Sequence, residues 1–206
     1  MLGADRSGRL RRPVAAGLTP AKNHAIYINQ YVVDTEAQTS HFGAYSLTYM
    51  GLDLDGLDVD DETPGRFWTH YFNSNPGMRA YAADRSIPAD AGKTELDIAA
   101  GVLTANTYLG DGTPLFRTKV KLSEKIGESV RGHLRYITLN DGILESGRYA
   151  YVGNNVEQFE VESLEFLAPD HPSYALRPAD PLEITFGFYS PASSFCYPGG
   201  VEPLQG

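Results

Sequence analysis

The sequence predicts a mainly β fold of the α+β class: an antiparallel β-cone, barrel or sandwich with one or two short helices. Short segments rich in Tyr, Val, Ile and Phe recur along the chain, separated by turn residues. Two of the turns, Asp111-Gly112 and Asp141-Gly142, have the residues typical of tight hairpins. A clear helix start occurs at Asn75-Pro76. A closed sheet of this kind removes exposed edges and can enclose a ligand cavity.

Three strands and the helix are expected in the first half of the chain. Residues 25–33 and 44–50 are rich in Tyr and aliphatic side chains, and residues 66–73 form an aromatic third strand. Asn75 can cap the helix that follows, and Pro76 suits its first turn.

The second half of the chain is expected to consist mainly of β-hairpins. Its predicted strands are 94–98, 102–109, 115–122, 129–139, 143–152 and 182–189. Residues 156–167 alternate like a strand in their first half, whereas Leu164 and Leu167 suit a helix, so both assignments stay open. The segment after Pro191 is expected to be a loop.

The length of 206 residues suits one domain. We expect a flexible N-terminal arm, residues 1–20, followed by a single β-rich small-molecule-binding domain, residues 21–206. The arginines of the arm are not followed by the apolar stretch of a secretory signal. No apolar run approaches the roughly 18 residues of a membrane span. We therefore expect a cytoplasmic protein without a membrane partner.

Charge and composition argue against several other partners. The formal net charge is −9 and the isoelectric point is about 5.0. Nucleic-acid binding needs clustered Lys and Arg, so no nucleic-acid partner is expected. The one cysteine, Cys196, cannot form an internal disulfide. The histidines lack metal-ligand spacing and the acidic residues 51–65 lack the spacing of a calcium loop, so no metal or cofactor is expected.

The densest group of aromatic and ionisable residues lies at 66–96. Strand alternation predicts that Trp68 and Phe72 share the face of His70. An apolar pocket around His70 would make its imidazole a general acid or base near neutral pH. The alternative is a histidine whose hydrogen bonds are satisfied within the sheet.

Other side chains could bind a substrate. Arg66, Arg79 and Arg85 are candidates for holding a carboxylate or enolate, with surface solvation as the alternative. Arg148 and Tyr151 belong to a second polar and aromatic cluster on a predicted strand. Lys93 could form a Schiff base with a ketone if desolvation activated its amine, and an exposed lysine at the start of a strand is the alternative.

The order of several short motifs resembles that of the acetoacetate decarboxylase family over roughly residues 26–122. The motifs are Gly43-Ala44-Tyr45, Asn73-Ser74-Asn75, Ile87-Pro88 and Gly110-Asp111-Gly112. The resemblance implies a β-rich cone around a small-molecule cavity, usually assembled into oligomers. It also implies decarboxylation of β-keto acids through a lysine Schiff base, and some relatives perform aldol-type condensation and dehydration of keto acids.

This sequence differs from the family at the positions that carry that chemistry. The reactive lysine pair reads Ala89 and Asp90, and the expected glutamate reads Leu47 or Thr48. Lys93 would replace the missing lysine only if the turn after the preceding proline were remodelled.

We therefore expect an enzyme of lyase or cyclase type that acts on a keto-acid or polyketide-like substrate in secondary metabolism. Its chemistry would be lysine-independent acid/base catalysis, such as cyclisation, dehydration or decarboxylation. His70 and Asp90 are the expected proton-transfer groups, and the expected cavity wall is Trp68, Tyr71 and Tyr45.

Two other functions remain open. A non-catalytic β-barrel binding protein for an aromatic or lipid-like ligand would also lack the reactive lysine. A structural or scaffold subunit has less support. In each case we expect a homo-oligomer, because the resemblance implies one.

Overall fold

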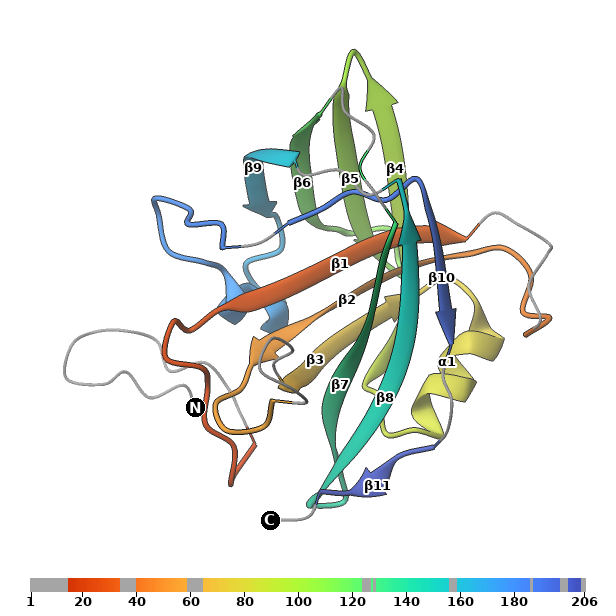
Figure 1. Ribbon diagram of the computed structural model, residues 1–206, viewed down its shortest axis with the longest axis vertical. Helices are drawn as coiled ribbons and strands as arrows, with labels where there is room; N and C mark the ends of the chain where they lie inside the picture. Colours follow the sequence, from red (N-terminus) through yellow and green to blue (C-terminus); the bar gives the residue numbers. More distant parts are fainter. Residues whose placement is uncertain are drawn as a thin grey trace.

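One mixed sheet organises the chain in the computed structural model (Figure 1). The structure describes residues 15–33, 40–58, 65–123, 127, 129–155, 159–185, 187–196 and 200–204. Within these residues the main strand order is β10-β8-β7-β3-β4-β5-β6-β9; β2 pairs with β3 and β1, and β11 pairs with β8. The strands are β1 (Ile26–Val33), β2 (Tyr45–Asp53), β3 (Gly65–Asn73), β4 (Ala89–Ala99), β5 (Val102–Leu109), β6 (Pro114–Leu122), β7 (Val130–Asn140), β8 (Ile143–Asn154), β9 (Phe159–Phe166), β10 (Ala192–Cys196) and β11 (Glu202–Pro203).

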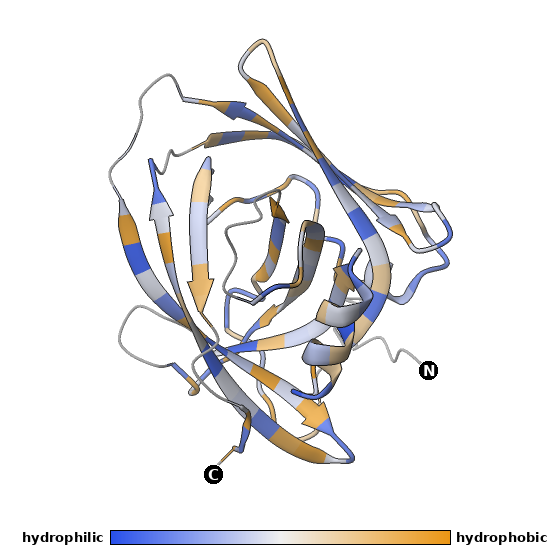
Figure 2. Ribbon diagram, turned by 90° about the vertical axis from the view of Figure 1, so that its right-hand side faces the viewer, coloured by the Kyte–Doolittle hydropathy of each residue, from blue (hydrophilic) through white to orange (hydrophobic). Residues whose placement is uncertain are grey.

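The two wings of the sheet diverge at β3. One edge of β3 pairs antiparallel with β2, while the other pairs in parallel with β7 at residues 65–67 and with β4 at residues 71–73. β7 leads into β8 and β10, and β4 leads into β5, β6 and β9; Figure 2 shows the two wings curving apart. The predicted mainly β fold is confirmed. The two parallel pairings make the sheet mixed rather than antiparallel throughout.

Helix α1 (Pro76–Ala83) explains the parallel pairing of β3 with β4. A connection between parallel strands has to cross over the sheet, and a helix is the usual means. The side chain of Asn75 accepts a hydrogen bond of 3.0 Å from the backbone nitrogen of Met78, and Pro76 stands in the first turn, as predicted. α1 buries Met78 and Ala82. None of the helices in the described residues has the length and apolar character needed to span a membrane.

A β-bulge in β3 changes which side chains share a face. The register with β2 passes from Met50 opposite His70 to Gly51 opposite Trp68, so Thr69 is the extra residue. The Thr69 hydroxyl donates a 3.0 Å hydrogen bond to the carbonyl oxygen of Met50. Trp68 therefore faces away from His70, and the prediction that they share a face is wrong.

Hydroxyl groups link β1 and β2 to the wing that contains β4, β5 and β6. Thr48 on β2 lies 2.6 Å from Thr94 on β4 and 2.7 Å from Thr107 on β5, measured between hydroxyl oxygens. Gln30 on β1 donates to the Thr107 hydroxyl at 3.0 Å and accepts from Thr118 on β6 at 2.9 Å. Because these polar groups satisfy one another, they hold β1 and β2 in a fixed position against β4, β5 and β6.

The structure corrects the prediction for the C-terminal part. The open segment 156–167 contains strand β9, whereas the described residues of 182–189 form no continuous strand. β10 lies in the region predicted as a loop and pairs with β8. Its sequence Ala-Ser-Ser-Phe-Cys has little alternation, so tertiary pairing rather than local pattern determines this strand. A 3-10 helix, η1 (Pro172–Leu176), precedes it.

The folded part begins before the predicted domain boundary at residue 21. Leu18 is buried in a cluster with Leu54 and Ile137. Residues 1–14 of the predicted arm lie outside the described residues, as do residues 59–64 of the acidic segment.

Candidate functional site

The bulge divides the predicted site residues between two faces of the sheet. We call the face that carries Trp68 and Tyr71 the aromatic face, and the face that carries His70 and Phe72 the histidine face. The buried side chains of the aromatic face form one cluster: Tyr27, Leu47, Tyr49, Trp68, Tyr71, Ala82, Ile87, Leu134 and Tyr136. The predicted cavity-wall residue Tyr45 and the substrate-binding candidate Tyr151 pack against its rim.

Stacked rings fill the centre of the aromatic face. The Trp68 ring stacks against Tyr49 at 4.4 Å and against Tyr136 at 4.7 Å between ring centroids, and Tyr71 lies 6.0 Å away. Trp68 and Tyr71 are each only 1% exposed. These rings are therefore packed core, and the side chains of this face that a ligand can reach are those at its rim.

Burial holds three tyrosines of the aromatic face in their protonated form. Burial raises the pKa of Tyr45 and Tyr71, and it raises the pKa of Tyr136 to about 12. A neutral phenol can donate a hydrogen bond to a carbonyl or enolate oxygen but does not act as a base at neutral pH.

Ala89 lies on the aromatic face. It is opposite Tyr71 in the parallel register of β3 and β4, and its methyl group packs against the aromatic cluster. The resemblance puts the first reactive lysine of the family at this position. The structure therefore has a methyl group where that lysine would meet an aromatic, largely buried surface.

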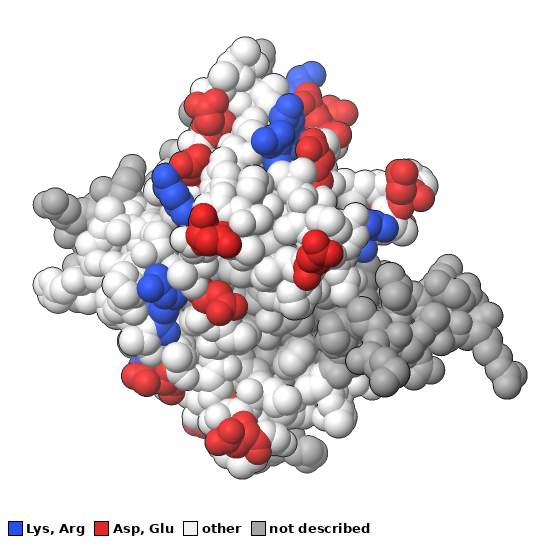
Figure 3. Space-filling model, turned by 180° about the vertical axis from the view of Figure 1, so that it is seen from behind, with Lys and Arg blue, Asp and Glu red and all other residues white. Residues whose placement is uncertain are grey.

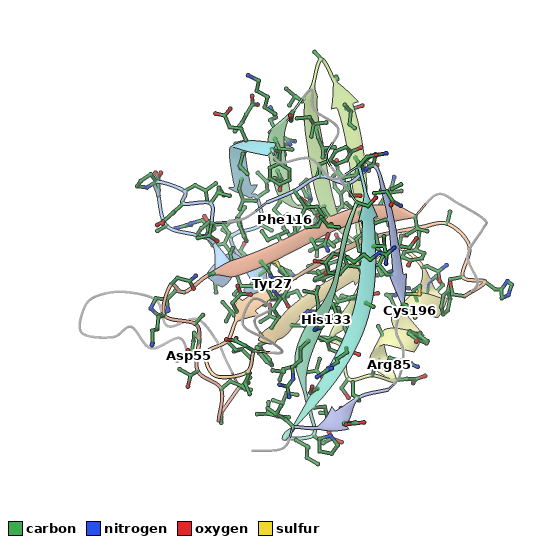
Figure 4. The ribbon with its side chains drawn as sticks, in the orientation of Figure 1. Tyr27, Asp55, Arg85, Phe116, His133 and Cys196 are labelled. Atoms are coloured by element: carbon green, nitrogen blue, oxygen red, sulfur yellow. The ribbon has the colours of Figure 1, made fainter. Side chains whose placement is uncertain are left out.

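Arg85 lies just beyond the C-terminal end of α1, beside the aromatic face (Figure 4). Its guanidinium carbon stands 3.5 Å from the ring centroid of Tyr81, and Nη1 donates to the Tyr81 carbonyl oxygen at 3.0 Å. Its buried Nε has no hydrogen-bond partner among the described residues. Next to Arg85, the Ser86 hydroxyl donates to the Glu145 carboxylate at 2.5 Å. The role of Arg85 as an anion holder stays a prediction.

Two of the other predicted arginines differ from Arg85 in their contacts. Nε of Arg66 donates to Asp53 Oδ1 at 3.0 Å, and the guanidinium lies 4.7 Å from the centroid of the Tyr27 ring. Burial raises the pKa of Asp53, and Arg66 partly offsets this. Arg148 is exposed on β8, opposite Arg135 in β7. The described contacts therefore give Arg66, Arg85 and Arg148 different partners.

A groove of about 810 Å³ extends along β4 beyond Ala89, and we call it the β4 groove. Its lining is Val32, Val33, Ala44, Tyr45, Ser46, Ser74, Arg79, Ala91, Gly92, Lys93, Thr94, Glu95, Tyr108, Leu109, Gly110 and Gly112. Strand alternation places Ala89, Ala91, Lys93 and Glu95 on the same side of β4. The groove thus continues the aromatic face, and it brings Tyr45 and Lys93 together.

Lys93 forms an ion pair on the wall of the groove. Its Nζ lies 2.6 Å from Glu95 Oε1, and this contact raises the pKa of Lys93 and lowers that of Glu95. Tyr108 stands opposite Lys93 in the β4–β5 register and hydrogen-bonds Glu95. An activated amine needs a lowered pKa, so this setting favours a fixed ammonium over a nucleophile. Lys93 also stands four residue steps, about 13 Å, along the strand from Ala89.

Arg79 brings a second cation to the groove from α1. Its Nη1 donates to the Asn73 carbonyl oxygen at 2.9 Å. The charged residues in the lining are thus two cations, Arg79 and Lys93, and one anion, Glu95.

On the histidine face, His70 and Asp90 meet a residue that sequence reasoning missed, His171. The His70 ring stacks on Phe72 at 5.9 Å and lies 5.7 Å from the ring of His171. Asp90 is opposite Phe72 in the β3–β4 register, and its carboxylate acts against the lowering of the His171 pKa by burial. Burial and His171 lower the pKa of His70 to about 4, so His70 is neutral at pH 7.

The missed residues differ in how far sequence could reveal them. His171 lies about 100 positions from His70 in a proline-rich connection, and no local pattern indicates the contact. The contacts of Glu95 and Tyr108 could have been predicted from the sequence. Glu95 lies on the same side of its strand as Lys93, and the predicted hairpin places Tyr108 beside both residues. In the described residues, no group of three or more His, Cys, Asp or Glu side chains is placed to hold a metal ion.

Comparisons with known proteins give a result at the level of structure alone. No family profile matches the sequence, and no curated protein matches it. An acetoacetate decarboxylase structure superposes with a TM-score of 0.56 at 14% identity, covering 89% of this chain and 80% of that one. An acetoacetate decarboxylase-like enzyme from Sphingomonas wittichii RW1 gives 0.52 at 14% identity, covering 93% and 84%. The enduracididine biosynthesis enzyme MppR, complexed with pyruvate, gives 0.53 at 10% identity, covering 80% and 73%.

These likenesses establish the fold. The chain has an acetoacetate decarboxylase-like fold, and the solved proteins that share it include enzymes. At identities of 14% or lower, the residues that carry the activity have to be argued from this chain's own geometry.

Proposed function

We propose that the chain is an enzyme of lyase or cyclase type that acts on a keto-acid or polyketide-like substrate without forming a lysine Schiff base. The observation that carries this proposal is Ala89, which puts a methyl group on the aromatic face at the position of the family's lysine. The β4 groove beside it is large enough for a small organic molecule. The structure of MppR with pyruvate supports a keto acid as the substrate class.

The β4 groove contains groups suited to enolisation of a ketone. The Glu95 carboxylate would accept a proton from the carbon next to the carbonyl group, and negative charge would develop on the carbonyl oxygen. Hydrogen bonds from the Tyr45 phenol and the Lys93 ammonium would stabilise that charge. The proton would then return to carbon, or the enolate would expel a leaving group or attack a second carbonyl.

The histidine face is a second place where protons could move. His70, His171 and Asp90 lie together there, and His70 and Asp90 are the predicted proton-transfer groups. The sheet separates them from a ligand in the β4 groove. We favour the groove because it has both volume and access, and variants of His70 and Glu95 distinguish the two locations.

A non-catalytic binding protein is the alternative function. The ion pair of Lys93 with Glu95 favours this alternative, because it leaves Lys93 without an activated amine. Ala89 provides no amine on the aromatic face.

Proton exchange in D₂O tests the proposal directly. Pyruvate, 2-oxobutanoate, acetoacetate and benzoylacetate would each be incubated with the protein, following deuterium incorporation by NMR and products by mass spectrometry. We expect exchange above the buffer rate, its loss in Glu95→Gln, and its retention in His70→Ala and in the control Lys121→Gln, an exposed lysine on β6. Loss in His70→Ala with retention in Glu95→Gln would move the site to the histidine face. Absence of exchange and product with all four acids would favour the binding protein.

A further inference from the structure

The charge of the β4 groove is opposite to that of the chain. The chain has a formal net charge of −9, whereas Arg79, Lys93 and Glu95 give the groove lining a net charge of +1. On the rear face of the molecule, the described acidic and basic side chains are interspersed and do not form a patch of one sign (Figure 3). A small site with excess positive charge on an acidic protein favours an anionic ligand.

We infer that the β4 groove binds an amphipathic monocarboxylic acid, with its carboxylate at Lys93 and Arg79 and its apolar body along Val32, Val33 and Leu109. This inference rests on the proposed function and deepens it by naming the substrate class. It assigns Lys93 to binding the carboxylate through its charge, with no covalent step at that residue.

Both cations have donors left for a ligand. An ammonium group has three N–H donors, and the described contact of Lys93 with Glu95 uses one of them. A guanidinium group has five, and the described contact of Arg79 with Asn73 uses only Nη1. Anchoring by Glu95 and by the Asn73 carbonyl oxygen also reduces the side-chain freedom that a bound carboxylate would otherwise have to remove.

The apolar side chains of the groove would contact the apolar body of the ligand. Val32 is 42% exposed, and it lines the groove together with Val33. Tyr45 stands opposite Val33 in the β1–β2 register and packs against the aromatic cluster. A hydrocarbon or aryl group placed here would remove this surface from water.

Glycines on β4 and in the turn between β5 and β6 form part of the groove lining. A Cβ atom on Gly92 would lie 2.8 Å from the Tyr108 carbonyl oxygen, and one on Gly110 would lie 2.7 Å from the Ala91 Cβ. Gly112 has a φ of +89°, which side chains rarely adopt. The backbone at Gly92 is therefore packed closely against Phe72 and β5, and Gly110 and Gly112 add no side chain to the groove lining.

The position of Glu95 next to Lys93 predicts how its substitution changes the affinity for an acid. Its carboxylate competes with a ligand carboxylate for Lys93 and repels it. Glu95→Gln should therefore tighten binding of an acid, although the same change should abolish the proton exchange described above. A groove built for a cationic ligand would show the reverse.

Isothermal titration calorimetry on the full chain tests this inference. The probe is 3-phenylpropanoate, which has a carboxylate and an aryl group but no ketone; 3-phenylpropanamide is the neutral match and 3-phenylpropylamine the cationic one. We expect the acid to bind, and the amide and amine to bind at least about tenfold more weakly. Lys93→Gln and Arg79→Gln should each raise Kd for the acid about threefold to tenfold, Glu95→Gln should lower it, and Lys121→Gln should leave it unchanged.

The outcomes separate the inference from the proposed function. Unchanged Kd in both Lys93→Gln and Arg79→Gln, preference for the amine, or no binding of the acid by the wild-type chain overturns the inference. Lys93 is exposed, so its variant is expected to fold even if the Arg79 variant is destabilised. Binding of the acid with the expected variant pattern, together with no turnover of any keto acid, supports the inference and overturns the enzyme proposal alone.

Discussion

Trp68 and His70 stand two residues apart in β3 yet face opposite sides of the sheet, because the bulge at Thr69 inserts one extra residue between their partners on β2. Trp68 thereby joins the aromatic cluster, and His70 stacks on Phe72. A shift of one residue in the strand register thus places Trp68 in the aromatic core and His70 on the opposite face, beside His171.

The bulge depends on a glycine on the facing strand. A Cβ on Gly51 would lie 1.9 Å from the Phe67 carbonyl oxygen. We expect Gly51→Ala to lower the free energy of unfolding by about 3 kcal/mol, because the backbone has to move apart. Urea denaturation measures this change. Gly77→Ala in α1 is the matched control; its nearest contact is 3.2 Å, to a side-chain atom, and we expect a change below about 1 kcal/mol. Equal effects of the two changes would contradict this account of the bulge.

The hydroxyl of Thr48 should contribute to stability by joining β2 to β4 and β5. Thr48→Val removes two hydrogen bonds, to Thr94 and Thr107, and leaves buried hydroxyl groups with fewer partners. We expect a loss of about 1–3 kcal/mol in the free energy of unfolding, measured by thermal or urea denaturation. The same change at Thr104, a partly exposed threonine of β5, should have a smaller effect. A Thr48→Val protein as stable as the wild type would show that the network is dispensable.

The pH dependence of stability should report His70. Its pKa is about 6.5 when unfolded and about 4 in the fold, so the unfolded chain takes up the proton first as the pH falls. The free energy of unfolding should decrease between pH 6.5 and pH 4, and His70 should account for up to about 3 kcal/mol of that decrease. His70→Leu should flatten the profile in this window. Parallel profiles for wild type and His70→Leu would contradict the burial of a neutral His70.

Local structure can be predicted from the sequence where a side chain determines the backbone directly. Asn75 and Pro76 begin the helix, and the Asp-Gly turns connect their hairpins, because each of these residues acts on its immediate neighbours. The bulge at Thr69, the pairing of β10 with β8 and the contact of His171 with His70 depend on segments far apart in the chain. Alternation alone therefore assigned Trp68 to the wrong face.

A lysine returned to the aromatic face should recover amine chemistry. In Ala89→Lys the aromatic surroundings should lower the pKa of the new amine, which increases its nucleophilic fraction. We expect borohydride to trap an adduct of this variant with pyruvate, detected by intact-mass spectrometry and mapped to residue 89. Ala91→Lys, two residues along the same side of β4 and exposed, is the control and should give little or no adduct. A folded Ala89→Lys protein without an adduct would show that keto acids do not reach this position.

The most direct test of the central claim is the same trapping experiment on the unmodified chain. The wild-type protein would be reduced with borohydride in the presence of pyruvate, acetoacetate or benzoylacetate and weighed by intact-mass spectrometry. Lysine-independent chemistry predicts an unchanged mass with each acid, together with the proton exchange expected of the β4 groove. A stoichiometric adduct that maps to Lys93 would contradict the account and make Lys93 a Schiff-base nucleophile.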